Sequence, residues 1–339
     1  MTLPSASSSP TLAAPASIPS AKLVVLVPCL DEERTVAEVV RGVLEATRHL
    51  ERVTVVVVDD GSTDETARRA AEAGAEVLRH PQNLGLGRAF RAGVQEALRQ
   101  GAEVVVNIDG DGQFDPARIP DLVAPVLAGE ADMVTASRFL DPALTPQMPA
   151  IKRWGNRWVA RIVNVLTGRR FADVSCGFRA FSREALLRMN LFGGFTYTQE
   201  TFLDLVFKGM AIREVAVAVR GTRRYGESRV ASSLTRYALR SLQIMVRAFI
   251  GYRPFSFFSV LATFFTAFGL ALLGFLLVHF LRTGAFSPHI WAGFTGGGFV
   301  LLGILTGVLG VVGDMLVRMR MNQEEILYFL KRRAYDRGR

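Results

Sequence analysis

The segment VVVNIDGDGQFDP, residues 104–116, ends a strand-like run with a dense group of carboxylates. Asp109 and Asp111 alternate along an extended chain, so both point to the same side, and Gln113 continues the alternation. Carboxylates this close repel one another unless a cation lies between them. Mg²⁺ is typically held by one or two carboxylates together with substrate phosphates. The segment therefore predicts a divalent-cation and polyphosphate site, and the alternative is a solvated acidic turn.

Valine-rich runs of the same kind indicate the fold around this segment. They occupy residues 22–28, 53–59, 103–109 and 132–137, and helical patterns lie between them at 34–48, 64–73 and 86–99. Alternating strands and helices predict an α/β fold, with a parallel sheet covered by helices on both faces. In such sheets ligands bind beyond the carboxyl ends of the strands.

Acidic clusters follow three of these runs. PCLDEE (28–33) follows the first, DDGSTDET (59–66) the second, and DGDGQFDP (109–116) a third. A buried core does not account for three acidic clusters on one edge, whereas a binding site does. Ser62 or Thr63 also fits as the cap of a helix that starts near Asp64, which leaves Asp59 and Asp60 unexplained. The glycines of NLGLGRAFRAG (83–93) fit a phosphate-binding turn and helix entry equally well.

The apolar residues are concentrated near the end of the chain. Half of the residues are hydrophobic, yet the formal charge is +9. Residues 255–281 and 290–313 contain no Asp, Glu, Lys or Arg. As helices they would be ~40 and ~36 Å long, enough to cross a bilayer core. The alternative is a pair of buried core helices. The Ser/Pro/Ala-rich residues 1–20 do not resemble a signal peptide and fit a disordered tail.

Basic residues predict the orientation in the membrane. The link between the two spans holds only Arg282, whereas the segment after them is rich in Lys and Arg, so both flanks are expected in the cytosol. Residues 231–253 have their arginines along one stripe of a predicted helix and fit an amphipathic interface helix. Since the positive charge adjoins the membrane, nucleic acid binding is disfavoured. Two cysteines and four scattered histidines suggest neither a disulfide framework nor zinc.

An ordered set of motifs carries a family resemblance. VPCLDEE, VVVDDGSTDET, NLGLGRAFRAG, NIDGDGQFDP, ASRF, KRWGNRW, DVSCGFRAF and RRYGESRV precede the paired membrane helices. In this order the chain resembles glycosyltransferase family 2, and within it the polyprenol-phosphate glycosyltransferases, from about residue 22 to 330. One departure is Asp31, where the family usually has Asn.

The resemblance implies a GT-A (Rossmann-like) nucleotide-sugar domain and a role for each matching residue. Mg²⁺ or Mn²⁺ would be held against the donor diphosphate by Asp109, Asp111 and Gln113. Asp173 would lie near the sugar. The nucleoside pocket would be lined by Pro28, Asp31, Glu32, Asp59 and Asp60. The acceptor phosphate would be received by Arg138, Arg153, Arg224 and Arg229.

The chemistry expected of such a site is a single displacement. A lipid monophosphate has a second pKa of about 6, so it is largely ionised at cytosolic pH and needs little help from a general base. Asp173 is therefore expected to position groups. One displacement inverts the anomeric carbon. The predicted reaction moves a hexose from a UDP-glucose or GDP-mannose type of donor to undecaprenyl or dolichyl phosphate. The alternatives are a processive polysaccharide synthase and a non-catalytic nucleotide-sugar-binding membrane protein.

The predicted organisation is an integral protein of a bacterial-type inner or cell membrane with a cytoplasmic catalytic domain. The donor sugar and the oligomeric state stay open, a homo-oligomer included. The predicted segments are a disordered tail (1–20), the GT-A domain (21–230), the interface helix (231–253), a two-helix transmembrane hairpin (254–317) and a basic cytosolic tail (318–339).

Overall fold

The computed structural model of the chain describes residues 21–191, 197–220, 243, 246 and 249–336. The part of the chain before the two apolar helices contains a seven-stranded sheet in the order β3-β2-β1-β4-β6-β5-β7. The strands are β1 (Leu23–Cys29), β2 (Val53–Asp59), β3 (Glu76–Arg79), β4 (Val104–Asn107), β5 (Met133–Ser137), β6 (Arg179–Ser182) and β7 (Ile212–Ala216).

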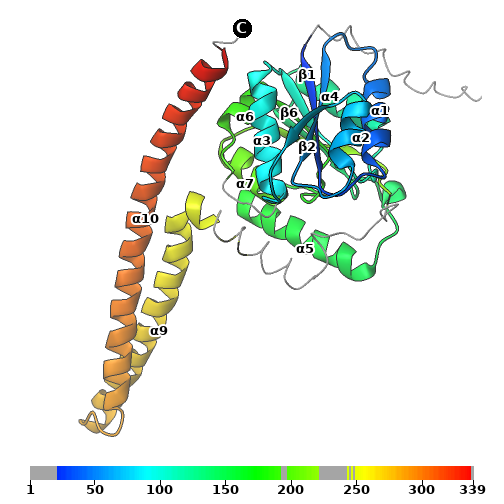
Figure 1. Cartoon of the computed structure of the whole chain (residues 1–339). Coiled ribbons are helices and arrows are strands. Elements are labelled where there is room, and N and C mark those ends of the chain that lie inside the picture. Colours follow the sequence, from blue (N-terminus) through cyan, green and yellow to red (C-terminus); the bar gives the residue numbers. More distant parts are fainter. Residues whose placement is uncertain (1–20, 192–196, 221–242, 244–245, 247–248, 337–339) are drawn as a thin grey trace, which may run out of the picture.

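The central strands are buried on both faces, as valine-rich parallel strands require. Alternate residues of β1 enter two separate cores: Val24 and Leu26 face one, and Val25 and Val27 the other. Figure 1 shows α1 (Val36–Ala46) and α2 (Thr66–Glu72) on one side of the sheet. The helices on the other side are α3 (Leu86–Arg99), α6 (Arg183–Arg188) and α7 (Thr198–Phe207). The predicted α/β class with helices on both faces is confirmed.

The expectation of a purely parallel sheet is wrong at one strand. β1 pairs in parallel with β2 and β4, but β6 is antiparallel to both β4 and β5. β6 closes the gap between those two parallel strands, and its short sequence, RAFS, begins with a buried arginine. Further described elements before the apolar helices are α4 (Ile119–Leu127), α5 (Ala150–Thr167) and two short 3₁₀ turns, Pro116–Arg118 and Pro142–Leu144.

Two long helices follow, α9 (Pro254–Thr283) and α10 (Ile290–Asp336), and they pack on each other along their length (Figure 1). Both are long and apolar enough to cross a membrane. Only 6% of the most apolar window of α9 is buried and 17% of that of α10, so they are not core helices. They approach closely at Gly269, where a Cβ atom would lie 2.7 Å from the carbonyl oxygen of Gly296. Small residues of this kind let helix backbones meet.

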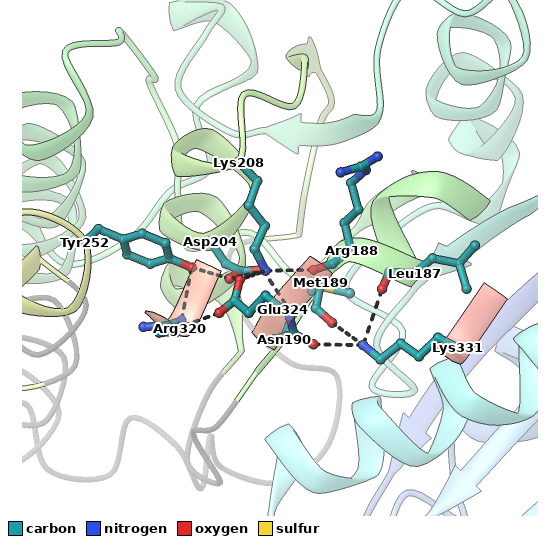
Figure 2. Close-up of polar contacts among 10 residues, drawn as sticks. All are labelled: Leu187, Arg188, Met189, Asn190, Asp204, Lys208, Tyr252, Arg320, Glu324 and Lys331. Atoms are coloured by element: carbon teal, nitrogen blue, oxygen red, sulfur yellow. Dashed lines mark hydrogen bonds and ion pairs between the residues drawn. The ribbon is translucent and has the colours of Figure 1, made fainter. Parts of the chain in front are cut away.

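Beyond its apolar part, α10 continues without a break to Asp336, so the predicted tail from residue 318 is helical as far as the structure describes it. Residues 318–336 are called the docking segment, and Figure 2 shows its side chains Arg320, Glu324 and Lys331, of which Glu324 and Lys331 contact residues of the α/β domain. Glu324 pairs with Lys208, which follows the last residue of α7, at 3.0 Å and with Arg320 at 2.7 Å. Burial raises the pKa of Glu324, but these two positive charges outweigh it and hold the pKa below its ordinary value.

A second group of contacts anchors the docking segment at the end of α6. The ammonium group of Lys331 donates to the carbonyl oxygen of Met189 at 3.0 Å and to Oδ1 of Asn190 at 2.8 Å (Figure 2). A cation at the carboxyl end of a helix also gains from the helix dipole. Tyr328 donates to Glu184 at 3.0 Å. The apolar helix pair is thus joined directly to the α/β domain.

Candidate active site

The predicted acidic groups meet at the carboxyl ends of β1, β2 and β4. Cys29 pairs with Asp59 in the β1–β2 register. The pKa of the Cys29 thiol is raised well above its ordinary value, first by burial and then by four negative charges. Those charges are on Glu32, Asp59, Asp109 and Asp111. The thiol therefore stays protonated, and it marks the point around which four carboxylates from three loops converge.

The loops after β1 and β2 are joined to each other. Asp31 adopts a left-handed backbone conformation (φ 50°), and its Oδ1 accepts from the backbone N–H of Thr63 at 2.8 Å. Ser62 Oγ accepts from the backbone N–H of Asp31 at 2.9 Å instead of capping a helix. Helix α2 begins only at Thr66, so the capping interpretation of Ser62 and Thr63 is wrong. Thr66 Oγ1 accepts from the backbone N–H of Glu32 at 2.8 Å.

Asp59 and Asp60 lie side by side in sequence but have different surroundings. Asp59 is fully buried; its Oδ1 accepts from the backbone N–H of Ser62 at 2.9 Å. Its Oδ2 forms an ion pair with Arg79 at 3.2 Å and has no hydrogen-bond donor within the described residues. Asp60 accepts from the backbone N–H groups of Leu84 at 3.0 Å and Gly85 at 2.8 Å. Asp60 therefore holds the entry to α3, a structural task that the sequence did not show.

The segment after β4 is held tightly against β1. Thr35 Oγ1 donates to the carbonyl oxygen of Gly110 at 2.7 Å, and a Cβ atom on Gly110 would lie 2.3 Å from Cys29 Sγ. Asp111 is buried, and its Oδ1 accepts from the backbone N–H of Gln113 at 3.0 Å. The Gln113 side chain itself donates to the carbonyl oxygen of Arg220 at 3.2 Å. The structure thus brings the two predicted carboxylates together and ties Gln113 to the chain after β7.

These residues fit a cation that is shared with a ligand rather than enclosed by the protein. No group of three or more His, Cys, Asp and Glu side chains within the described residues could hold a metal ion by itself. Mg²⁺ usually takes one or two carboxylates and completes its coordination with phosphate oxygens and water. The concentration of negative charge around Cys29 suits such an ion.

Buried Asp173 pairs with partly buried Arg138, which follows the carboxyl end of β5. Arg138 donates to both Asp173 oxygens, at 2.6 and 2.9 Å, and its backbone N–H donates at 3.2 Å. Burial raises the pKa of Asp173, but the charge and hydrogen bonds of Arg138 outweigh it and lower the pKa below its ordinary value. Glu214 of β7 accepts from the backbone N–H groups of Ala172 and Asp173, both at 2.8 Å. An ionised, doubly hydrogen-bonded carboxylate is a poor base and a good positioning group.

Three supporting residues, Asn107, Arg179 and Tyr197, were not predicted. Asn107 of β4 donates to the carbonyl oxygen of Gly177 at 2.9 Å and to the Tyr197 hydroxyl at 2.7 Å. Arg179 is fully buried and donates to the carbonyl oxygens of residues 174, 176 and 198. Together they place Gly177, whose Cβ position would lie 3.0 Å from an Asp109 oxygen. The motif DVSCGFR contained a signal for the role of Arg179. A charged residue at the start of a strand needs several hydrogen-bond partners when it is buried.

The remaining predicted residues lie further out. Pro28 lies within the buried strand β1, next to the cluster. Arg153 lies on the exposed face of α5. Arg224 and Arg229, and most of the predicted interface helix 231–253, lie outside the described residues.

Comparison with known proteins agrees with this architecture. Residues 24–189 match the family described as Glycosyl transferase family 2. The uncharacterised protein MJ1222 of Methanocaldococcus jannaschii is 32% identical over 67% of this chain and 93% of its own length. The polyprenol monophosphomannose synthase of Mycolicibacterium smegmatis is 28% identical over 66% of this chain and 87% of its own length. The undecaprenyl-phosphate 4-deoxy-4-formamido-L-arabinose transferase of Pseudomonas fluorescens is 28% identical over 89% of both chains.

The fold has a solved counterpart. The glucosyl-3-phosphoglycerate synthase of Mycobacterium tuberculosis, solved with Mn²⁺, uridine diphosphate and phosphoglyceric acid, superposes with a TM-score of 0.55. It is 23% identical, over 68% of this chain and 78% of that one. That likeness shows the GT-A-like fold, and the sequence relatives show the activity class. The chain belongs to glycosyl transferase family 2 and is a glycosyltransferase.

Proposed function

We propose that this enzyme transfers a hexose from a nucleotide sugar to a polyprenyl phosphate, with inversion, at the cytosolic face of a membrane. One observation carries the proposal. The acidic cluster around Cys29 lies in a glycosyltransferase domain, and that domain is joined directly to two helices apolar enough to cross a membrane. Two relatives support the acceptor class: one is named for polyprenol monophosphomannose and the other for undecaprenyl phosphate.

The donor would bind at the carboxyl edge. Asp59, at the end of β2, and the joined loop that contains Asp31 and Glu32 would hold the nucleoside. Asp109 and Asp111, with the donor diphosphate, would hold Mg²⁺ or Mn²⁺, and Gln113 stays a proposed ligand. Such an ion would stabilise the negative charge that develops on the departing nucleotide diphosphate. Charges preorganised in a water-poor site contribute much of the rate enhancement of such enzymes.

The acceptor phosphate would approach from the side of Arg138. The ion pair with Asp173 holds the guanidinium group in one orientation, and Arg153, Arg224 and Arg229 would add positive charge around the lipid phosphate. An ionised phosphate monoester needs placement more than deprotonation. The lowered pKa of Asp173 supports a positioning role rather than a general base. A single in-line attack gives an inverted, phosphate-linked sugar with no covalent enzyme intermediate.

The membrane arrangement is part of the proposal. α9 and the apolar half of α10 would span the bilayer, with the link between them outside the cell. The docking segment of α10 would then lie in the cytosol with the catalytic domain, in agreement with its Lys and Arg content.

The test is a transfer assay with the purified full chain in detergent. Undecaprenyl phosphate and labelled UDP- and GDP-sugars are incubated with Mg²⁺, with Mn²⁺ or with excess EDTA. We expect one donor class to give a lipid-linked product and EDTA to abolish it. Asp111→Asn should lose transfer, whereas Asp115→Asn should keep it, because exposed Asp115 only caps a 3₁₀ turn and Asn caps equally well. Full transfer in EDTA or in Asp111→Asn would overturn the metal assignment.

A further inference from the structure

Glu214 is a carboxylate on the core-facing side of a strand. It lies in the middle of β7, beside Thr135 of the parallel strand β5. Alternate residues of a strand face the same side of the sheet. Glu214 therefore shares its face with Ile212, which packs against the core that contains Phe171 and Val174. A strand normally has an apolar residue at such a position, so the carboxylate needs an explanation.

The hydrogen-bond partners of Glu214 are backbone groups. One of its oxygens accepts from the N–H of Ala172 and the other from the N–H of Asp173, each at 2.8 Å. Burial raises the pKa of Glu214, and these two hydrogen bonds offset only part of that rise, so the pKa stays above its ordinary value. Taking a carboxylate out of water costs stability. A carboxylate that is kept where an apolar side chain would pack therefore indicates a further role.

The two backbone donors belong to the segment that holds Arg138. The Asp173 carboxylate is buried and accepts from the Arg138 guanidinium group at 2.6 and 2.9 Å. It also accepts from the backbone N–H of Ser175 at 3.0 Å. Arg138 follows the last residue of β5, the strand that pairs with β7, and its side chain is 18% exposed. One line of contacts therefore runs from Glu214, through the backbone of Asp173, to a guanidinium group that reaches the surface.

The geometry requires a carboxylate at position 214. Ala172 and Asp173 are consecutive residues, so their two N–H groups need two acceptor atoms side by side. A carboxylate has two acceptor oxygens, whereas the amide of glutamine turns an NH₂ donor toward one of the N–H groups. That mismatch would leave a donor without an acceptor and displace the backbone of Asp173. Displacement of a positioning group by about 1 Å can cost about a hundred-fold in rate.

We infer that Glu214 is a positioning residue for the acceptor: it fixes the backbone of Asp173, whose carboxylate orients the guanidinium group of Arg138 toward the lipid phosphate. The action of Glu214 is indirect, through this ion pair. A guanidinium group in a fixed orientation suits a phosphate monoester, because its planar fork of N–H donors binds two phosphate oxygens at once. The inference rests on the proposed role of Arg138 in binding the acceptor phosphate.

Glu214→Gln in the purified full chain tests the inference through two measurements. The first is the KM for undecaprenyl phosphate at saturating donor, and the second is the Kd of the labelled nucleoside diphosphate of that donor, measured with Mn²⁺ by equilibrium dialysis. We expect the acceptor KM to rise about ten-fold, while the Kd changes less than about two-fold. Glu130→Gln is the matched control, because exposed Glu130 pairs with exposed Arg213 of the same strand and should leave both values unchanged.

Two further variants separate positioning from a purely structural role. Glu214→Asp keeps both acceptor oxygens on a shorter side chain, so its acceptor KM should lie between those of wild type and Glu214→Gln. If Glu214→Gln does not fold, the raised acceptor KM of Glu214→Asp carries the test. In an Arg138→Lys background Glu214→Gln should raise the acceptor KM no further, because both changes act through the same guanidinium group.

The outcomes distinguish the inference from the function on which it rests. A wild-type acceptor KM in Glu214→Gln, with a raised one in Arg138→Lys, would overturn the inference and leave the proposed function intact. Equal increases in the acceptor KM and the Kd, or effects of the two substitutions that multiply, would also overturn it. A wild-type acceptor KM in Arg138→Lys would overturn the role of Arg138 and the inference together. Absence of any product on undecaprenyl phosphate from the wild-type chain would overturn the proposed function itself.

Discussion

Gly110→Ala tests the packing that holds the two proposed metal ligands. The added methyl carbon would lie 2.3 Å from Cys29 Sγ, whereas its next neighbours would be at 3.5 Å, an ordinary contact. Nonbonded heavy atoms prefer about 3.5–4 Å, so the overlap exceeds about 1 Å. Because Thr35 holds the Gly110 carbonyl from the other direction, the backbone between Asp109 and Asp111 has little room to move. Overpacking of this kind costs about 1–3 kcal/mol.

The clash involves one atom, so removing that atom should relieve it. Cys29→Ala alone should cost about 1 kcal/mol for the lost sulfur. The double variant Cys29→Ala/Gly110→Ala should recover most of the loss, which corresponds to a favourable coupling of about 1–3 kcal/mol between neighbours. Gly155→Ala is the matched control, because a Cβ atom there meets nothing within 4 Å.

The assay measures both stability and transfer for the four variants. Thermal unfolding in detergent should show a fall of about 2–4 °C per kcal/mol for a domain of this size. Transfer should fall more than ten-fold in Gly110→Ala, since misplacement of catalytic groups by about 1 Å can cost about a hundred-fold in rate, and should return in the double variant. A double variant that loses at least the sum of the two single losses would refute the reasoning.

Three further predictions concern the site and its supports. Gly177→Ala puts a methyl group 3.0–3.1 Å from both Asp109 oxygens, so metal-dependent transfer should fall with little change in unfolding temperature; an unchanged rate would contradict the placement. Lys331→Met leaves its oxygen partners without a donor and should cost about 1–3 kcal/mol, seen as faster cleavage by protease, while exposed Arg333→Met should behave like wild type. Because the pKa of Asp173 is lowered in the folded protein, its ion pair stabilises the fold above the ordinary carboxyl pKa of about 4 and loses that contribution as pH falls through the lower folded-state value. In an unfolding-against-pH series Asp173→Asn should therefore decline less steeply than wild type in this range, and parallel curves would contradict the pairing.

Local pattern was enough to predict the central strands and one helix with accuracy. The run 53–59 is β2, and the pattern 86–99 is α3. A short apolar run predicts a buried strand, and apolar residues spaced three and four apart predict an amphipathic helix. β6 was missed because it is four residues long and begins with Arg179, whose burial depends on carbonyl groups from distant segments. A buried charge contradicts any local strand pattern.

In the candidate site, too, local features were predicted and features that depend on distant contacts were missed. Asp109 and Asp111 were placed correctly at a strand end because their spacing is local. Asp60 was predicted to line the nucleoside pocket and Asp173 to lie near the sugar. Spacing could not reveal that Asp60 accepts from the backbone N–H groups of Leu84 and Gly85, or that Asp173 pairs with Arg138, because these partners lie 24 to 35 residues away in sequence. Glu324 and Lys331 lie in the segment that was predicted only as a basic cytosolic tail (318–339). Only the contact with α6 and α7 shows their task.

Acceptor discrimination tests the central claim most directly. The purified chain is incubated with its productive labelled donor and with undecaprenyl phosphate, undecaprenyl diphosphate or undecaprenol. The masses of the lipid products are then measured by mass spectrometry. The account predicts one hexose on the monophosphate, joined through a single phosphate, and no product on the alcohol. Sugar on the alcohol or the diphosphate, with none on the monophosphate, would contradict the proposed nucleophile and the reaction built on it.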